Sequence, residues 1–306
     1  MADFCKPFKE MTIDNYINKI ISLYGAGKYG ISDRVCLNMG RFLHRNEYSD
    51  KAKNPLISVY IPTYNRVEML LERSIPSVLD QTYDNFELLI VGDHCTDNTE
   101  KCVKSIDDAR IKFFNIKKRD YRYPPIPENH WLVGPVVAAN TALGLVSGKW
   151  IARIDDDDTW DTKHLENSLE FACRNDFEFV SSRVLEEKEG IERIECGAHA
   201  QSEYYTRKKK IAKGYNPKIG GTATWLYRSY LRNIKYNINC WRKSWNRAND
   251  IDLSIRLYKV GVKMGFLDEL HAFIRPRPDE TTTGREAYVK NEAKINRHYR
   301  FDENKY

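Results

Sequence analysis

The chain has 306 residues, enough to bury a substantial core in one large domain or in two halves that share a cleft. Its 42% hydrophobic and 30% charged residues and its mean hydropathy of −0.62 indicate a soluble globular protein. No apolar run approaches the ~20 residues that span a bilayer, and the N-terminal sequence lacks the apolar stretch of a signal peptide. The seven cysteines are scattered without a Cys-x-x-Cys pair. This pattern predicts a cytoplasmic protein with reduced thiols, without a disulfide or zinc framework.

The net charge of +6 is unevenly distributed along the chain. The segment from Tyr204 to Asn249 has no Asp or Glu, but it has 12 Lys and Arg, all of them within residues 207–247. Such a segment is a solvated basic face, a contact for a phosphate-bearing ligand, or a peripheral contact with an anionic membrane. Aromatic residues between the basic ones also suit single-stranded nucleic acid. The sequence matches no nucleic-acid-binding module, however, and we expect no nucleic-acid partner.

The middle of the chain alternates between patterns typical of strands and of helices. We expect strands at 56–61, 86–91 and 111–115, and helices at 67–81, between 99 and 106, and at 136–145. Pro76 should kink or shorten the first of these helices. The alternation predicts a parallel sheet with crossover helices. Residues 119–135 are rich in proline and aromatic side chains, and they predict a long irregular loop, which in compact domains is often functional.

Four consecutive aspartates, Asp155–Asp158, follow a segment rich in Trp and Ile that is typical of a buried strand. Carboxylates this close repel one another, so a strand that ends in them calls for a cation, and hard oxygen ligands suit Mg²⁺ or Mn²⁺. The alternative is a solvated acidic turn. It is disfavoured because the polar loops at 62–66 and 92–99 follow two other strands and reach the same edge of a parallel sheet, where ligands bind.

A further helix is predicted at 249–258, where Ile251, Ile255 and Tyr258 form an apolar face. Asp250 lies in its first turn, where the helix dipole favours a negative charge. The helical patterns of residues 1–54 are interrupted by Gly25, Gly27 and Gly30, and we expect them to form an extension before the core.

Five short motifs occur in order along the chain. They are Ser58-Val-Tyr-Ile-Pro-Thr-Tyr-Asn-Arg66, Gln81-Thr-Tyr83, Val91-Gly-Asp-His-Cys-Thr-Asp97, the stretch from Asn140 to Trp160, and Asn249-Asp-Ile-Asp-Leu253. Each is weak alone, but together, over about residues 55–280, they resemble the inverting family 2 glycosyltransferases. The resemblance implies an α/β protein of the GT-A fold. Such a fold has a Rossmann-like, mostly parallel sheet flanked by helices, here with an N-terminal helical extension.

The resemblance also implies a nucleotide-diphosphate sugar donor carrying UDP, GDP or dTDP. The residues that would bind it are Pro62, Thr63, Tyr64, Arg66, Asp93, Asn140, Asp155 and Asp156. In this reading Thr63 and Tyr64 contact the base, and Asp93 accepts hydrogen bonds from its N–H edge. The metal, Mn²⁺ or Mg²⁺, would be held by Asp157 and Asp155. Other GT-A enzymes use a histidine in the region after the base helix as a further metal ligand, and in this chain the resemblance assigns that role to His271.

Inverting transfer needs a general base that takes the proton of the acceptor hydroxyl. The resemblance assigns this role to Asp250, with Asp252 in reserve; the alternative role for Asp250 is a helix cap. The acceptor would be a glycan or a lipid-linked or protein-linked sugar. Asn249 stands where the family has Glu, and Gly92 and His94 stand where it has Asp and Gly.

The resemblance divides the chain into four parts. They are a helical extension (1–54), a nucleotide-sugar-binding half (55–160), an acceptor-binding half (161–280) and a charged tail (281–306). Two other functions stay open. One is a nucleotide-sugar-binding protein whose activity has lapsed, as the departures from the family allow. The other is a nucleotidyltransferase, which would need a glycine-rich phosphate loop that residues 62–66 do not provide.

Overall fold

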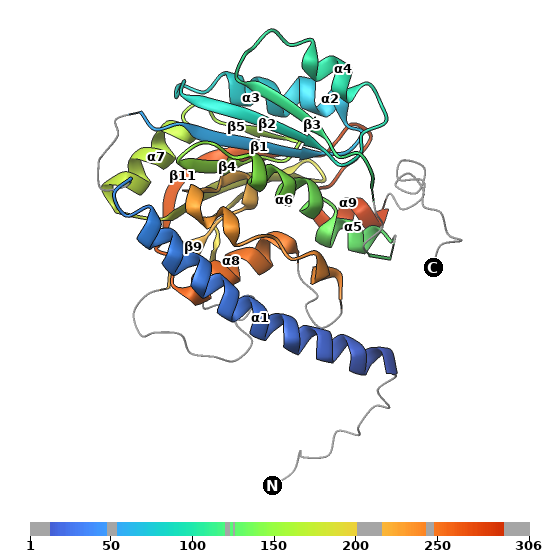
Figure 1. Ribbon diagram of the computed structural model, residues 1–306. Coiled ribbons are helices and arrows are strands. Elements are labelled where there is room, and N and C mark those ends of the chain that lie inside the picture. Colours follow the sequence, from blue (N-terminus) through green and yellow to red (C-terminus); the bar gives the residue numbers. More distant parts are fainter. Residues whose placement is uncertain are drawn as a thin grey trace.

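The computed structural model describes residues 13–47, 54–119, 123–124, 126–200, 216–242 and 248–290. Within these residues, nine strands form one sheet in the order β3-β2-β1-β4-β10-β6-β11-β5, with β7 paired to β6 (Figure 1). The strands are β1 (Ile57–Thr63), β2 (Phe86–Gly92), β3 (Ile111–Asn115), β4 (Trp150–Arg153), β5 (Asp158–Trp160), β6 (Phe179–Lys188), β7 (Ile191–Glu195), β10 (Leu226–Arg228) and β11 (Met264–Ile274). A small second sheet pairs β8 (Ala198–His199) with β9 (Lys218–Ile219).

The predicted α/β fold is confirmed. Strands β3, β2, β1 and β4 are mutually parallel, as the alternation of strands and helices predicts. Strand β10 then runs antiparallel between β4 and β6, and β11 returns parallel to β6. The carboxyl ends of β1, β2 and β4 therefore lie at one edge of the sheet, where the loops after them meet.

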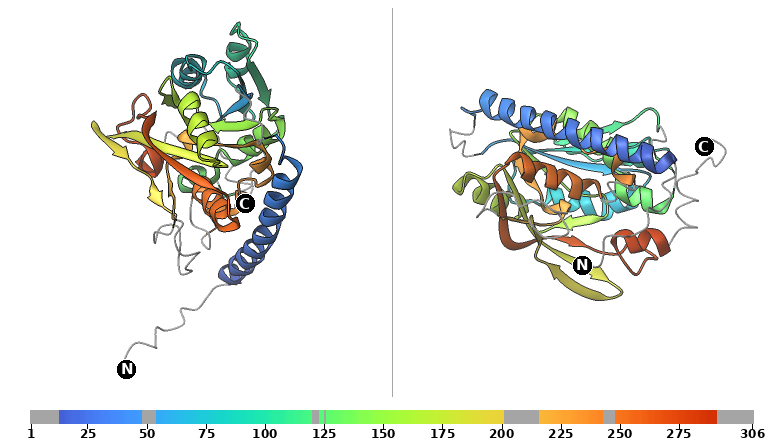
Figure 2. Two further views of the ribbon diagram at one scale, coloured as in Figure 1. Left: turned by 90° about the vertical axis from the view of Figure 1, so that its left-hand side faces the viewer. Right: turned by 90° about the horizontal axis from the view of Figure 1, so that it is seen from below.

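Helices cover both faces of the sheet (Figures 1 and 2). They are α1 (Ile13–Leu43), α2 (Val67–Met69), α3 (Ile75–Leu79), α4 (Thr99–Lys104), α5 (Pro127–Val133), α6 (Val136–Leu145), α7 (His164–Arg174), α8 (Asn249–Val260) and α9 (Gly284–Lys290), with the short 3₁₀ turns η2 (Thr222–Thr224), η3 (Ser229–Asn233) and η4 (Ile238–Trp241). Alternate residues of β1 enter different cores: Val59 and Ile61 pack with α3 and α7, whereas Tyr60 packs with α6 and α8.

The helix predicted at 67–81 is broken, as Pro76 leads one to expect. A π-helical turn, η1 (Leu70–Ser74), separates α2 from α3, and Pro76 lies in the first turn of α3. Proline has no N–H to donate to the preceding turn, and a π turn is one way in which a helix accommodates such a break.

Two expectations from the sequence are wrong. The glycines of the N-terminal extension do not interrupt it, because α1 is continuous over 31 residues and packs against α8 and η3. The stretch 119–135 is not wholly irregular, because its second half forms α5, with Pro127 in the first turn, where proline is tolerated.

Glu87 joins the parallel strands near their amino ends, away from the edge where their carboxyl ends meet. Its buried carboxylate accepts hydrogen bonds from the hydroxyls of Ser58 and Ser147 and from the ammonium of Lys112. Burial raises the pKa of the carboxyl, but these hydrogen bonds outweigh it and lower the pKa of Glu87 from 4.5 to about 2. Because the pKa of Glu87 is lower in the folded protein than in the unfolded chain, the charged carboxylate stabilises the fold at pH values above 4.5. This stabilisation is lost as the pH falls toward 2.

We therefore expect Glu87→Gln to destabilise the protein by about 1.5–3 kcal/mol at pH 7, the range for hydrogen bonds to a charged group. The difference from wild type should shrink below pH 4.5 as the wild-type carboxyl takes up its proton. Urea unfolding followed by circular dichroism at pH 7 and near pH 3 measures both. An equal difference at the two pH values would contradict a charged Glu87.

Candidate functional site

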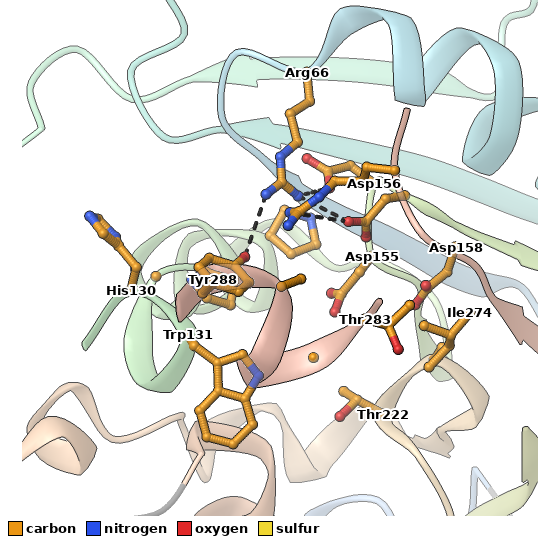
Figure 3. Close-up of a pocket in the computed structure, with 18 of the residues that line it drawn as sticks. Arg66, His130, Trp131, Asp155, Asp156, Asp158, Thr222, Ile274, Thr283 and Tyr288 are labelled. Atoms are coloured by element: carbon orange, nitrogen blue, oxygen red, sulfur yellow. Dashed lines mark hydrogen bonds and ion pairs between the residues drawn. The ribbon is translucent and has the colours of Figure 1, made fainter. Parts of the chain in front are cut away.

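A cavity of about 310 Å³ opens at the edge of the sheet where β1, β2 and β4 end. Its walls include the loops after these strands, the aspartate block, the start of α8, and the segment that leads into α9. Of the site residues expected from the sequence, those that line it are Pro62, Thr63, Tyr64, Arg66, Asp93, Asp155, Asp156, Asp157 and Asp250. Figure 3 shows Asp155 on one side of this cavity and Thr222 on the other.

The aspartate block is a turn between β4 and β5, in which the N–H of Asp158 donates to the carbonyl of Asp155 at 3.3 Å. Asp156 and Asp158 point into buried surroundings. The carboxylate of Asp156 accepts hydrogen bonds from the Thr63 hydroxyl (2.7 Å) and from Arg66 (2.8 Å). Burial raises the pKa of Asp156, and burial together with the three neighbouring carboxylates raises the pKa of Asp158 well above its usual range.

Asp155 and Asp157 are the more exposed members of the block, with 39% and 22% of their side chains accessible. One oxygen of Asp155 is held by Arg153 at 2.8 Å. One oxygen of Asp157 lies 3.3 Å from Arg66 and 3.6 Å from Arg277. The described residues contain no preformed group of three or more metal-ligating side chains. Asp155 and Asp157 nevertheless each have a second carboxylate oxygen, and carboxylate oxygens are hard ligands that suit a divalent cation. Such a cation would take its remaining ligands from a bound molecule.

Arginines gather beside the aspartates and come from three parts of the chain. Arg66 follows β1, and one of its amino groups donates to the Tyr288 hydroxyl of α9 at 3.4 Å (Figure 3). Arg277 follows β11 and lies over the Tyr288 ring, 5.1 Å from its centre. Arg73 holds the backbone of the segment after β11 by donating to the Pro276 carbonyl at 2.8 Å. The cavity therefore has positive charge directly beside its carboxylates.

The segment expected to be a charged tail, 281–306, begins with residues of the cavity wall and of α9. Residues 282–284, Ala287 and Tyr288 line the cavity, and α9 packs against α5. Residues 291–306 lie outside the described residues.

Another wall of the same cavity is formed by Tyr64, Asp93 and Arg119. The Arg119 guanidinium lies 3.7 Å from the centre of the Tyr64 ring, and its Nε is 3.1 Å from a carboxylate oxygen of Asp93. Asp93 is not the N-cap of α4, a position that Asn98 takes, and the N–H of Thr99 donates to the carboxylate of Asp97. Sequence reasoning missed Arg119, because it stands in a loop without periodicity.

Gly92 and His94, which differ from the residues of the family motif, are explained by the local structure. A Cβ on Gly92 would lie 2.8 Å from the Asn115 side chain and 2.9 Å from the Cys95 sulfur, so no side chain fits there. His94 has φ of 62°, the left-handed region where glycine is ordinarily favoured. The loop thus keeps a left-handed residue where the family has Gly.

Asp250 and Asp252 point in different directions from α8. Asp250 lines the cavity, accepts the Thr222 hydroxyl at one oxygen and accepts the N–H of Ile251 at the other, at 2.8 Å. It is not the cap residue of α8, a position that Ala248 takes. Asp252 is 1% exposed, lies 3.6 Å from Arg256 and is not a cavity residue.

His130 is the remaining candidate for proton transfer in the cavity wall. Burial, together with the charges of Arg119 and Arg66, lowers the pKa of His130 to about 3. Its imidazole is therefore neutral at physiological pH and a poor proton acceptor. Outside the aspartate block, the lining carboxylates other than Asp250 form ion pairs among the described residues, so Asp250 is the candidate that the geometry favours for accepting a proton.

Besides Asp252, two expected site residues lie outside the cavity. The Asn140 side chain forms two hydrogen bonds with the backbone of Tyr236. It donates to the carbonyl (3.0 Å) and accepts from the N–H (2.9 Å). His271 is buried against His164, with Glu269 3.2 Å away. The structure therefore does not bring Asn140 or His271 together with the aspartates.

The basic segment 207–247 is described only in part. The run Arg207–Lys210 and residues 243–247 lie outside the described residues. Within 216–242 the aromatic residues Trp225, Tyr227, Tyr230 and Tyr236 are buried in the core, so they do not form an exposed binding surface. None of the helices in the described part of the chain is long and apolar enough to cross a membrane.

The family follows from comparison with known proteins. Residues 58–234 match the model of Glycosyl transferase family 2, and the chain belongs to this family. The matched region contains β1, β2, β4 and the aspartate block, and it ends before Asp250. The matched region therefore covers the sheet side of the cavity and does not include Asp250.

Curated relatives match part of the chain. It is 37% identical over 125 residues to UDP-Glc:alpha-D-GlcNAc-diphosphoundecaprenol beta-1,3-glucosyltransferase WfgD of Escherichia coli, covering 41% of this chain and 44% of that protein. It is 27% identical over 209 residues to GalNAc(5)-diNAcBac-PP-undecaprenol beta-1,3-glucosyltransferase of Campylobacter jejuni, covering 67% of this chain and 60% of that protein. The chain thus spans less than two thirds of the length of these relatives.

Solved structures share the fold at low sequence identity. S. aureus TarS 1-349 in complex with UDP-GlcNAc has a TM-score of 0.51 at 18% identity, over 74% of this chain and 60% of that chain. Mannosyltransferase PcManGT from Pyrobaculum calidifontis, in complex with GDP-Man and Mn2+, has a TM-score of 0.50 at 12% identity. The match covers 90% of this chain and 71% of that chain.

Proposed function

We propose that the protein transfers a sugar from a nucleotide-diphosphate sugar to an acceptor hydroxyl, with inversion at the anomeric carbon. The observation that carries the proposal is the arrangement of one cavity. An aspartate block and two arginines lie on its sheet side. On its α8 side lies Asp250, the lining carboxylate outside this block that has no ion pair among the described residues. A cavity with a site for a leaving diphosphate and a separate proton acceptor suits a single displacement.

The nucleotide would bind across the ends of β1 and β2. Tyr64 and Arg119 offer flat surfaces for the base, and Asp93 offers an acceptor for its N–H edge. Arg66 and Arg277 would pair with the diphosphate, because guanidinium groups bind phosphate oxygens with parallel hydrogen bonds. UDP, GDP and dTDP donors all fit this chemistry.

A divalent cation, Mn²⁺ or Mg²⁺, would be held by Asp157 and Asp155, and when bound it would supply positive charge to the departing diphosphate. Asp156 would keep the turn in place through Thr63 and Arg66, since its carboxylate is already satisfied by them. The structural neighbour PcManGT is described with GDP-Man and Mn2+, which supports a metal-dependent reaction here.

The acceptor would enter from the side of η2 and α8. Thr222 donates to Asp250 and holds its carboxylate toward the cavity, where it can accept the proton of the attacking hydroxyl. Two relatives bear names that specify diphosphoundecaprenol-linked or PP-undecaprenol-linked acceptors, which supports a lipid-linked sugar as acceptor.

The stereochemistry of the product tests this function. One base on the acceptor side and a diphosphate site on the other side predict that an α-linked donor gives a β-linked product, without a covalent glycosyl-enzyme. NMR coupling constants of the purified product report the configuration. Donor binding without any turnover would indicate a protein with lapsed activity, and retained configuration would exclude Asp250 as the base of a single displacement.

A further inference from the structure

Among its described side chains, helix α1 is fixed to the rest of the protein along one side. Asp33 forms two hydrogen bonds with Arg256 of α8, at 2.7 and 2.8 Å. Leu37 is 1% exposed, and a Cβ on Gly40 would lie 2.7 Å from the Tyr230 ring. Arg41 pairs with Glu178 at 2.6 Å. These positions recur every three or four residues, so one face of α1 is rigidly attached to the protein.

The opposite face of α1 is unusually apolar for a surface that faces solvent. Its exposed large apolar residues, with the accessible fraction of each, are Ile20 (64%), Tyr24 (71%), Ile31 (72%), Val35 (49%), Met39 (56%), Phe42 (65%) and Leu43 (65%). We call these seven residues the α1 apolar face. From the helical rise, this face is about 35 Å long. Figure 2 shows α1 along the outside of the molecule.

Between Ile20 and Leu43 the exposed charges of α1 have one sign. From Ile20 to Leu43 the sequence contains one acidic residue, Asp33, and it is buried in its pair with Arg256. The exposed charged residues of this stretch are Lys28 and Arg34, and Arg45 and Glu47 follow just after the helix. The α1 apolar face is therefore accompanied by exposed cations and by no exposed anion between residues 20 and 43.

We propose that the α1 apolar face lies in the interface of an anionic lipid membrane, with Lys28, Arg34 and Arg45 at the level of the headgroups. Helices that bind membranes in this way combine an apolar face with basic residues beside it, and their binding grows with the apolar area and with anionic lipid. The surface is separate from the transfer reaction, and it differs from the basic segment 207–247. Through Arg256 and Asp33 it is joined to α8, the helix that bears Asp250.

A second copy of this chain fits the α1 apolar face less well. Pairing this face with itself would bring the cations of two helices together, and α1 has no exposed acidic residue between 20 and 43 to offset them. Like charges that face each other across a helix pair are unfavourable. The charge pattern therefore favours a lipid surface over a dimer.

Co-sedimentation of the full chain with vesicles tests the proposal. We expect binding to vesicles of phosphatidylcholine mixed with phosphatidylglycerol, and much weaker binding to phosphatidylcholine alone or at high salt. The variant Ile31→Glu/Met39→Glu should lower the partition coefficient by about tenfold or more, since it places charges in the apolar face. The variant Lys28→Glu/Arg34→Glu should lower binding to the anionic vesicles in particular.

The matched control is Ile191→Glu/Ile194→Glu on β7, which removes two apolar side chains of similar exposure (55% and 51%) and changes the net charge equally. It should bind vesicles as the wild type does. Circular dichroism of each variant establishes that the fold is retained. Equal vesicle binding by wild type and Ile31→Glu/Met39→Glu would overturn the proposal. So would a wild-type dimer, measured by light scattering without lipid, that this variant converts to a monomer while neither protein binds vesicles.

Discussion

Replacement of Asp250 by Asn is expected to lower turnover by about 10²–10⁴-fold, the usual contribution of a general base. Asparagine keeps the size of the side chain, and its carbonyl still accepts a hydrogen bond from Thr222 or Ile251, but it cannot take a proton. The affinity for the nucleotide-sugar donor should change little, because Asp250 lies on the α8 side of the cavity. Steady-state kinetics and donor titration by calorimetry measure these two quantities separately.

Asp252→Asn is the matched control, since it makes the same chemical change two residues further along the same helix. Asp252 is buried beside Arg256 and outside the cavity, so its substitution should lower thermal stability and leave the turnover of folded protein close to wild type. Loss of turnover in Asp252→Asn, with wild-type turnover in Asp250→Asn, would reverse the two assignments.

The sequence was sufficient to predict the edge of the sheet at which the site lies. Parallel strands place their carboxyl ends together, so the loops that carry Thr63 and Asp93 had to meet the aspartate block. Strand β3 and helix α6 agree with the predicted ranges because their apolar runs are clear and their ends are set by turn residues. The helix dipole argument places Asp250 at the start of α8, but Asp250 and Asp252 are about 200° apart around a helix, and only packing decides which faces the cavity.

The rest of the site depends on contacts between distant parts of the chain. Asn140 lies in a family motif, yet its amide matches the backbone of Tyr236, a residue 96 positions away. Arg119 pairs with Asp93 from a loop without periodicity, and Tyr288 reaches Arg66 from a helix with a charged, unremarkable sequence. No local pattern encodes such contacts, since each depends on how two elements pack.

Replacement of Asp157 by Ala is expected to lower the affinity for the donor, measured with Mn²⁺ present, by about 10²-fold or more. Asp157 and Asp155 are the more exposed carboxylates of the block, so they are the ones able to reach a cation shared with a diphosphate. Removing one of the two protein ligands weakens the binding of the cation, and with it the binding of the phosphate whose charge the cation neutralises. Calorimetric titration of a nucleotide sugar into the protein, with Mn²⁺ or with EDTA, measures the effect.

The fold should tolerate this change. The contacts of Asp157 with Arg66 and Arg277 are lost, but the repulsion that it exerts on Asp156 and Asp158 is lost as well. Asp161→Ala is the matched control, because Asp161 stands just beyond β5, is partly exposed, and does not line the cavity. It should bind donor with Mn²⁺ as the wild type does.

The titration in EDTA separates the two roles that Asp157 can have. If it serves as a metal ligand, its removal should leave metal-free donor affinity unchanged or slightly higher, because Arg66 and Arg277 no longer share their charge with its carboxylate. If its main role is to position these arginines, metal-free affinity should fall together with the affinity in Mn²⁺. Equal donor affinity of wild type and Asp157→Ala in Mn²⁺ would remove Asp157 from the metal site altogether.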